Sequence, residues 1–195
     1  MSAATLHGAI AGLETTGTAE PGHLGADGIF LRPGDWAFGS ARVRVSTLLG
    51  SGVALVLWAP QRRLGAVCHC LHPERPGGVL QATRLDGRYG GDVGLWLERR
   101  LDEAGCRWQD LQAMLAGGAQ VGAQVGAHGS TAGGTRAGAA DAAANIAWAQ
   151  QWAGRHGVPL VQQDVGGRVL RRLSLNLADG QLTVAHGGHL PVVPQ

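Results

Sequence analysis

Polar and apolar residues follow two different spacings in the first third of the chain, and both are typical of β-strands. Residues 42–48 alternate polar and apolar side chains, which predicts a strand with one buried face. After a tight turn at 49–52, the continuous apolar run 53–58 predicts a strand buried on both faces. A further strand is predicted over 64–71. Apolar residues on either side of the turn at 32–35 indicate a hairpin or a corner.

Helical spacing appears in two later segments. Residues 92–105 carry an apolar stripe, with Asp92 suited to the N-cap and Gly105 to the position after the last turn. Residues 140–155 form the second predicted helix. Further strands are predicted over 113–116, 158–163, 170–177 and 181–184. Strands therefore gather toward both ends without βαβ alternation, which favours an α+β domain with a mixed or antiparallel sheet.

Low-complexity segments divide the chain. Residues 1–27 are small and polar and are expected to form a flexible extension, and residues 187–195 a tail. Within the predicted domain, residues 28–186, the stretch 119–139 is almost entirely Gly, Ala, Gln, Ser and Thr. Such a stretch lacks apolar anchors and is expected to be a flexible insert.

Composition narrows the classes of partner. The formal net charge is +2, and all 16 basic residues are arginine with no run that alternates with aromatic residues, so nucleic acid is not an expected partner. The longest apolar run is too short to span a bilayer, and we expect neither membrane insertion nor a signal peptide. Three cysteines, Cys68, Cys70 and Cys106, form an odd and sparse set that is typical of a reducing cytoplasm.

Five short motifs then appear in order along the chain. They are Leu-x-Gly-Ser-x-Val-Ala-x-x-Leu at 48–57, Gly-Ala-x-Cys-His-x-Leu-x-Pro at 65–73, Arg-Tyr-Gly at 88–90, Gly-Gly-Ala at 117–119 and Asp-x-Gly-Gly at 164–167. Asn145 and Arg171 are two further residues of the same pattern. In their order and spacing these motifs resemble the CheD family of chemoreceptor glutamine deamidases over residues 28–186. The resemblance implies a layered α/β/β/α fold with mixed sheets, and hydrolysis of glutamine side-chain amides on chemoreceptors to glutamate.

The family's chemistry, as the resemblance implies it, needs a cysteine nucleophile and a histidine that activates it. The cysteine position of the Gly-Ser-Cys motif is Gly52 in this chain, and a glycine cannot attack an amide. The histidine position, seventeen residues later, is His69. The family's hydroxyl residue, six positions before the cysteine, maps to Ser46, with Thr47 adjacent. We expect Gly52 and His69 to lie close together with one of these hydroxyls nearby.

No other residue is a good replacement for the missing thiol. On a strand over 64–71, Cys68 and Cys70 would face away from His69, and Cys106 lies far along the chain. Two functions therefore stay open: a chemoreceptor glutamine deamidase, or an inactive relative that binds the cytoplasmic region of a chemoreceptor or the CheC phosphatase. Neither function implies a cofactor or a metal, and no histidine pair has metal-ligand spacing.

Overall fold

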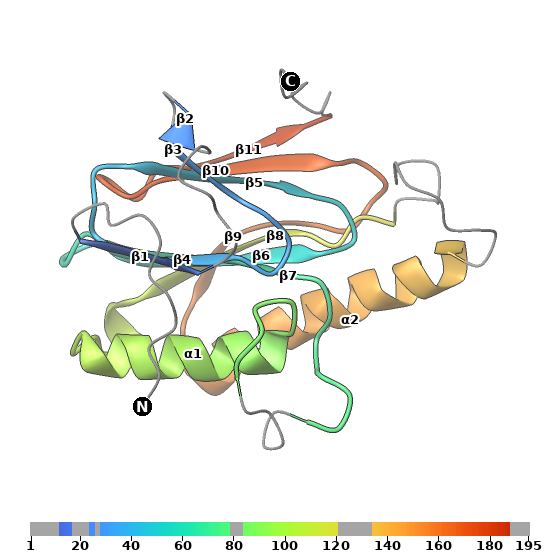
Figure 1. Cartoon of the computed structure of the whole chain (residues 1–195), viewed down its shortest axis with the longest axis horizontal. Helices are drawn as coiled ribbons and strands as arrows, with labels where there is room; N and C mark the ends of the chain where they lie inside the picture. The colour runs from blue at the N-terminus through green and yellow to red at the C-terminus, as the bar shows by residue number, and fades with distance from the viewer. Residues whose placement is uncertain (1–11, 17–23, 26–27, 79–83, 121–133, 188–195) are drawn as a thin grey trace.

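The computed structural model describes residues 12–16, 24–25, 28–78, 84–120 and 134–187 of the 195-residue chain (Figure 1). Most of the expected N-terminal extension, most of the Gly/Ala-rich insert and nearly all of the tail fall outside these ranges, so those expectations are not addressed by the described residues.

Two mixed β-sheets pack face to face (Figure 1). Sheet A has six strands in the order β1 (Leu13–Thr16), β4 (Trp36–Gly39), β7 (Leu64–Cys70), β6 (Val53–Ala59), β8 (Gln112–Gly117) and β9 (Leu160–Val165). Sheet B has five, in the order β11 (Leu182–His186), β10 (Arg171–Asn176), β5 (Arg44–Leu49), β3 (Gly28–Leu31) and β2 (Leu24–Gly25). Neighbouring strands are antiparallel except for the pairs β8–β9 and β3–β5.

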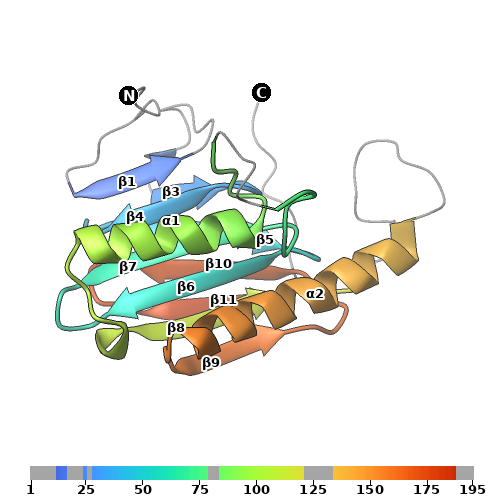
Figure 2. The same ribbon diagram turned by 90° about the horizontal axis from the view of Figure 1, so that it is seen from below.

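Both described helices, α1 (Gly90–Glu103) and α2 (Gly134–Arg155), cover the outer face of sheet A (Figures 1 and 2). A short 3₁₀ helix, η3 (Trp108–Asp110), leads into β8. The predicted α+β class with layered mixed sheets is confirmed. Within the described ranges the layers run α/β/β, because no described helix covers the outer face of sheet B.

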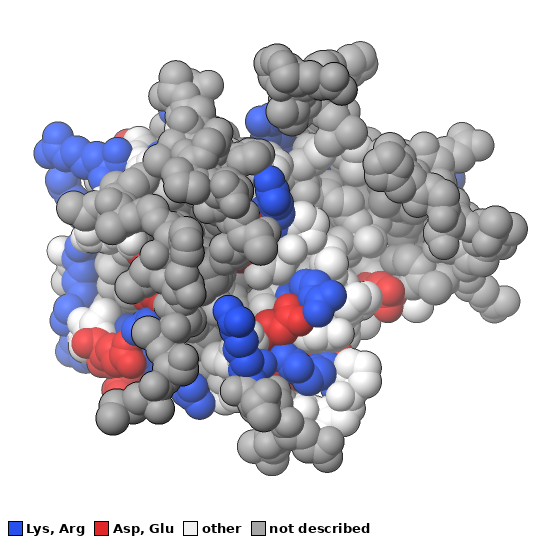
Figure 3. Space-filling view, viewed as in Figure 1, with Lys and Arg blue, Asp and Glu red and all other residues white. Residues whose placement is uncertain are grey.

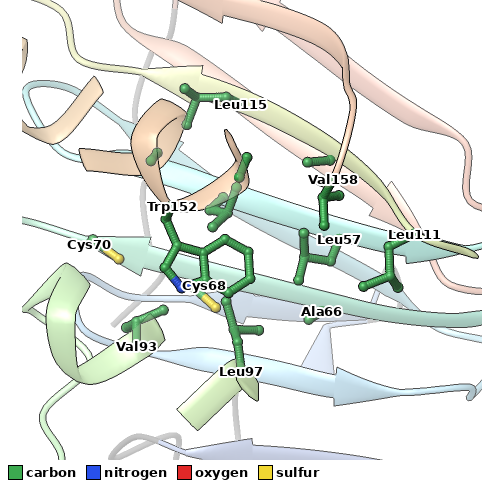
Figure 4. Close-up of a cluster of buried hydrophobic side chains, with 14 of the residues drawn as sticks. Leu57, Ala66, Cys68, Cys70, Val93, Leu97, Leu111, Leu115, Trp152 and Val158 are labelled. Atoms are coloured by element: carbon green, nitrogen blue, oxygen red, sulfur yellow. The ribbon is translucent and has the colours of Figure 1, made fainter. Parts of the chain in front are cut away.

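Strand β6 lies at the centre of sheet A and is buried along its whole length, as its continuous apolar run predicts. Successive side chains point to opposite faces of the sheet. Leu55 and Leu57 therefore join the core between sheet A and the helices, where Figure 4 shows Leu57, whereas Ala54 and Val56 join the core between the two sheets. This alternation also decides which side chains of β7 reach the space between the sheets.

Two glycines of α1 make room for two tryptophans of α2. A Cβ atom on Gly90 would lie 2.4 Å from the ring of Trp148, and one on Gly94 would lie 2.7 Å from Nε1 of Trp152. In both helices the pair is spaced by four residues, so each pair lies on one face. The two helices are thereby brought close over sheet A, with α1 above β7 and α2 above β6, β8 and β9.

Several elements differ from the sequence-based expectations. Strand β1 lies within the expected extension, where it pairs with β4; its four residues are too few for a period to be recognised. Of the two alternatives expected for the turn at 32–35, a hairpin or a corner, the structure has the corner, because β3 belongs to sheet B and β4 to sheet A. Helix α2 begins at Gly134, inside the expected insert.

The N-cap assigned to Asp92 is also wrong. Helix α1 begins two residues earlier, after Tyr89, and no side chain caps it. The fully buried Asp92 carboxylate instead forms an ion pair with Arg75 and accepts the backbone N–H of Asp86 at 2.7 Å. A buried carboxylate needs such partners, and these partners come from a loop that sequence spacing does not place.

Candidate functional site

The turn between β5 and β6 is held against the end of β8 by backbone hydrogen bonds. The carbonyl oxygen of Gly52 accepts the N–H of Gly118 at 2.8 Å, and that of Gly50 accepts the N–H of Ala119 at 2.7 Å. A Cβ atom on Gly117, whose φ is 109°, would lie 2.3 Å from the Gly52 oxygen. The Gly-Gly-Ala motif is therefore required for close approach of two backbones.

His69 lies on β7 and is only 2% exposed. Its neighbours Cys68 and Cys70 face the helices (Figure 4), so its own side chain points into the space between the sheets. Its backbone is held by the corner at 32–35: the His69 N–H donates to the Asp35 oxygen at 3.0 Å, and the Gly34 N–H donates to the His69 oxygen at 2.8 Å.

Thr47 connects the two sheets at this histidine. Its Oγ1 lies 2.8 Å from Nδ1 of His69 and donates its own proton to the Leu31 carbonyl oxygen at 2.9 Å. A hydroxyl has one proton to donate, so Oγ1 can only accept from the imidazole. The proton of the neutral ring is therefore assigned to Nδ1, which leaves the Nε2 lone pair free.

The free Nε2 faces position 52. A Cβ atom built on Gly52 would lie 3.1 Å from Nε2, so the expected proximity of Gly52, His69 and a threonine hydroxyl is present in the structure. Gly52 does not have a positive φ, and a side chain there would meet no backbone strain of that kind. The obstacle is the carbonyl oxygen of Cys70, 2.6 Å from the same Cβ position.

Ser46 does not take part in this arrangement. Its hydroxyl donates to the Ile29 oxygen at 3.3 Å, and Thr47 rather than Ser46 contacts His69. The signal was present in the sequence: Val45, Thr47 and Leu49 share the buried face of β5, so the alternation already directed Thr47 inward. Counting six positions from the motif selected the wrong face of the strand.

Burial controls the protonation of these groups. It lowers the pKa of His69 to about 4, so the imidazole is neutral at pH 7. Burial also raises the pKa of both Cys68 and Cys70, and their thiols are enclosed under the helices. The pKa of Cys106 is raised as well, again chiefly by desolvation. All three therefore stay protonated thiols at neutral pH, and none contacts Nε2 of His69 in the described structure.

A second buried polar residue lies beside the turn. Asn145 of α2 is 0% exposed and donates its side-chain Nδ2 to the Leu71 oxygen at 2.7 Å and to the Ser51 oxygen at 3.3 Å. The Asp-x-Gly-Gly motif lies at the other side of the β8 end, where Gly166 donates its N–H to the Gly117 oxygen at 2.9 Å. Its Asp164 pairs with the buried Arg171 at 2.7 Å.

Two ion pairs involve arginines of the loop that follows β7. In the loop between β7 and α1, Arg75 pairs with Asp92 and Arg88 with Asp86, and both guanidinium groups lie within 6 Å of the Tyr89 ring centroid. Figure 3 shows acidic and basic groups side by side in this region. Among the described residues, no three His, Cys, Asp or Glu side chains could hold one metal ion. No helix in the described ranges is long and apolar enough to cross a membrane.

The chain is similar to known proteins of one family. The model of the family described as CheD chemotactic sensory transduction matches residues 73–186, which is more than half of the chain. A protein of Chromobacterium violaceum named probable chemoreceptor glutamine deamidase CheD 1 is 32% identical over 86% of this chain and 81% of its own length. A similarly named protein of Pseudomonas syringae pv. tomato is 34% identical over 84% of this chain and 91% of its own.

Proposed function

This chain belongs to the CheD family of chemotaxis proteins, and we propose that its site binds glutamine side chains of chemoreceptors and directs hydrolysis of their amides to glutamate. The observation that carries the proposal is the orientation of His69. Thr47 holds its Nδ1 proton, and the free Nε2 lone pair faces the position from which a nucleophile would attack. A base held in one tautomer beside an attack position is what amide hydrolysis needs.

The reaction that these residues could perform differs from that of a thiol enzyme, because position 52 is glycine. Nε2 of His69 would take a proton from a water molecule, whose oxygen attacks the amide carbon. The same imidazolium would then return the proton to the departing nitrogen, so that glutamate and ammonia result. A histidine whose pKa is about 4 is a weak base, and this route is therefore expected to be slow.

A second function rests on Gly52 alone, and the names of the relatives do not favour it. The Cys70 carbonyl oxygen lies 2.6 Å from where a Cβ atom on residue 52 would lie, so the structure as it stands accommodates only glycine at this position. A protein with the family's site and no nucleophile can bind a receptor glutamine without turnover. On this alternative the partner is the cytoplasmic region of a chemoreceptor, or the CheC phosphatase. Both functions fit a protein of the reducing cytoplasm, since the three cysteines are free.

Ammonia release and binding separate these functions. A purified chemoreceptor cytoplasmic region is incubated with the wild-type chain and with His69→Gln, while complex formation is measured on the same samples. Slow ammonia release that is lost in His69→Gln supports hydrolysis by this site. Binding without ammonia supports the second function. If the receptor region neither binds nor reacts while CheC binds, CheC is the partner, and absence of all three signals contradicts both functions.

A further inference from the structure

The β-ladder between β6 and β7 ends beside the site. Its last pair is Val53 with Cys70. One residue further on, the N–H groups of Leu71 and His72 both donate to the Arg88 oxygen at 2.9 Å instead of to the β6 side. The two backbone segments therefore separate at Ser51 and Leu71. The carbonyl oxygens of these two residues need hydrogen-bond donors from elsewhere.

Asn145 supplies both donors. Its amide nitrogen contacts the Leu71 and Ser51 oxygens, one on each of the two separating backbone segments. Helix α2 holds this side chain at full burial, and the helix is itself fixed by the packing of Trp148 and Trp152 against α1. A short side chain with an NH₂ group can bridge two acceptors in this way, and among short side chains only asparagine carries one.

Both carbonyls belong to neighbours of the site. Ser51 directly precedes position 52, and Leu71 follows His69 by two residues and places its Cδ2 atom 3.2 Å from the Cβ position on Gly52. We propose that Asn145 is a positioning residue, which holds the β5–β6 turn closed over β7 and so sets the separation between position 52 and Nε2 of His69. The proposal takes position 52 as the place of the nucleophile and Nε2 as the base that activates it, and in that respect rests on the proposed function.

The side-chain oxygen of Asn145 makes no hydrogen bond within the described part of the chain, and this supports a specific role for its Nδ2 donor. Oδ1 of Asn145 is buried and has no hydrogen-bond partner among the described residues. An unpaired buried acceptor costs about 1–3 kcal/mol. An apolar residue of similar size would avoid that cost and still anchor the helix, but it would leave the Ser51 and Leu71 oxygens without the Nδ2 donor. The two hydrogen bonds at the turn are thus the contribution that only the amide makes.

The test measures how far the β5–β6 turn shields the His69 imidazole from water, and it needs no receptor. The pKa of the His69 imidazole is determined by NMR titration in the wild-type chain and in Asn145→Leu, which keeps the volume and removes the donor. If the turn opens, water reaches the imidazole and its pKa rises by at least about one unit toward its ordinary value. Asn145→Gln, which retains an NH₂ group, is expected to show a smaller rise.

Loss of stability alone must not produce this shift. Ala153→Gly, at a buried position of the same helix about two turns beyond Asn145, is the matched control; it costs about 1 kcal/mol in helix propensity. The proposal predicts an unchanged His69 pKa in this control. A pKa in Asn145→Leu equal to wild type, at reduced stability, would overturn it. Should Asn145→Leu fail to fold, Asn145→Ala is measured by the same criterion.

Discussion

The hydroxyl of Thr47, on one sheet, lies 2.8 Å from Nδ1 of His69, on the other, and this contact crosses the interface between the two sheets. Because the same hydroxyl donates its proton to Leu31, the imidazole must donate from Nδ1. The side of the ring that faces position 52 is therefore the basic one. The tautomer of the site is decided by the way the two sheets pack.

Replacement of the Thr47 hydroxyl is expected to remove the contact that fixes the tautomer of the His69 imidazole. Thr47→Val keeps the shape of the side chain but leaves the buried Nδ1 proton without an acceptor, which should destabilise the fold by about 1–3 kcal/mol. The imidazole ¹⁵N spectrum should then no longer show a single Nδ1-protonated form. Urea unfolding measures the first effect. Thr47→Ser retains the hydroxyl and should keep the tautomer; a wild-type tautomer in Thr47→Val would show that the contact does not orient the ring.

Stability should fall in acid because of His69. Its pKa is about 4 when folded and 6.5 when unfolded, so the unfolded state binds the proton first as the pH falls. The stabilisation is complete above about pH 6.5 and is lost between pH 6.5 and 4, by up to about 3 kcal/mol. Urea midpoints measured across this window should fall more steeply for the wild type than for His69→Gln. Parallel curves for the two proteins would mean that the imidazole is not buried in its neutral form.

Two glycine-to-alanine substitutions should have opposite effects on stability. Gly94→Ala places a Cβ 2.7 Å from Nε1 of Trp152 and should cost about 1–3 kcal/mol through overpacking, although alanine is the better helix former. Gly154→Ala, exposed near the end of α2 with no atom within 4 Å of its Cβ, should gain up to about 1 kcal/mol. Thermal unfolding of both variants checks this; a neutral Gly94→Ala would contradict the close packing of α1 on α2.

Much of the fold could be predicted from local pattern. Strand β6 combines a continuous apolar run with burial on both faces, and the alternation in β5 placed its apolar residues correctly. What could not be predicted depends on contacts distant in sequence. The choice of a corner over a hairpin at 32–35 depends on β3 and β4 joining different sheets, and Asp92 pairs with a loop arginine instead of capping its helix. Neither outcome has a signature within a few residues of sequence.

The site was predictable in part for the same reason. The spacing of the motifs brought Gly52 and His69 together correctly, because neighbouring antiparallel strands convert a fixed loop length into a fixed pairing. Residue counting selected Ser46, whereas the alternation of the strand places Thr47 at the histidine. The contact of Asn145 with the turn depends on how α2 packs over sheet A, which no sequence spacing specifies.

A cysteine at position 52 should be tolerated at a cost. Gly52 has no positive φ, but the end of β7 must move to relieve the contact between the new Cβ and the Cys70 oxygen. We expect Gly52→Cys to fold with stability reduced by about 1–3 kcal/mol, as measured by urea unfolding. Gly52→Ala is the matched control, because it introduces the same Cβ without a thiol and should lose a similar amount. A Gly52→Ala variant as stable as the wild type would show that the space around position 52 accommodates a Cβ atom without cost.

The most direct test of the account is the rate at which a purified chemoreceptor loses glutamine amides, followed by ammonia release and by the mass of the modified peptides, with Gly52→Cys compared with the wild-type chain. The thiol would lie beside Nε2 of His69, so Gly52→Cys should deamidate the receptor, and the activity should vanish in Gly52→Cys/His69→Gln. The wild type should be slower by a factor of about 10³ or more, as expected where a nucleophile is absent. A folded, receptor-binding Gly52→Cys that releases no more ammonia than the wild type, or rapid wild-type turnover that survives His69→Gln, would contradict the account.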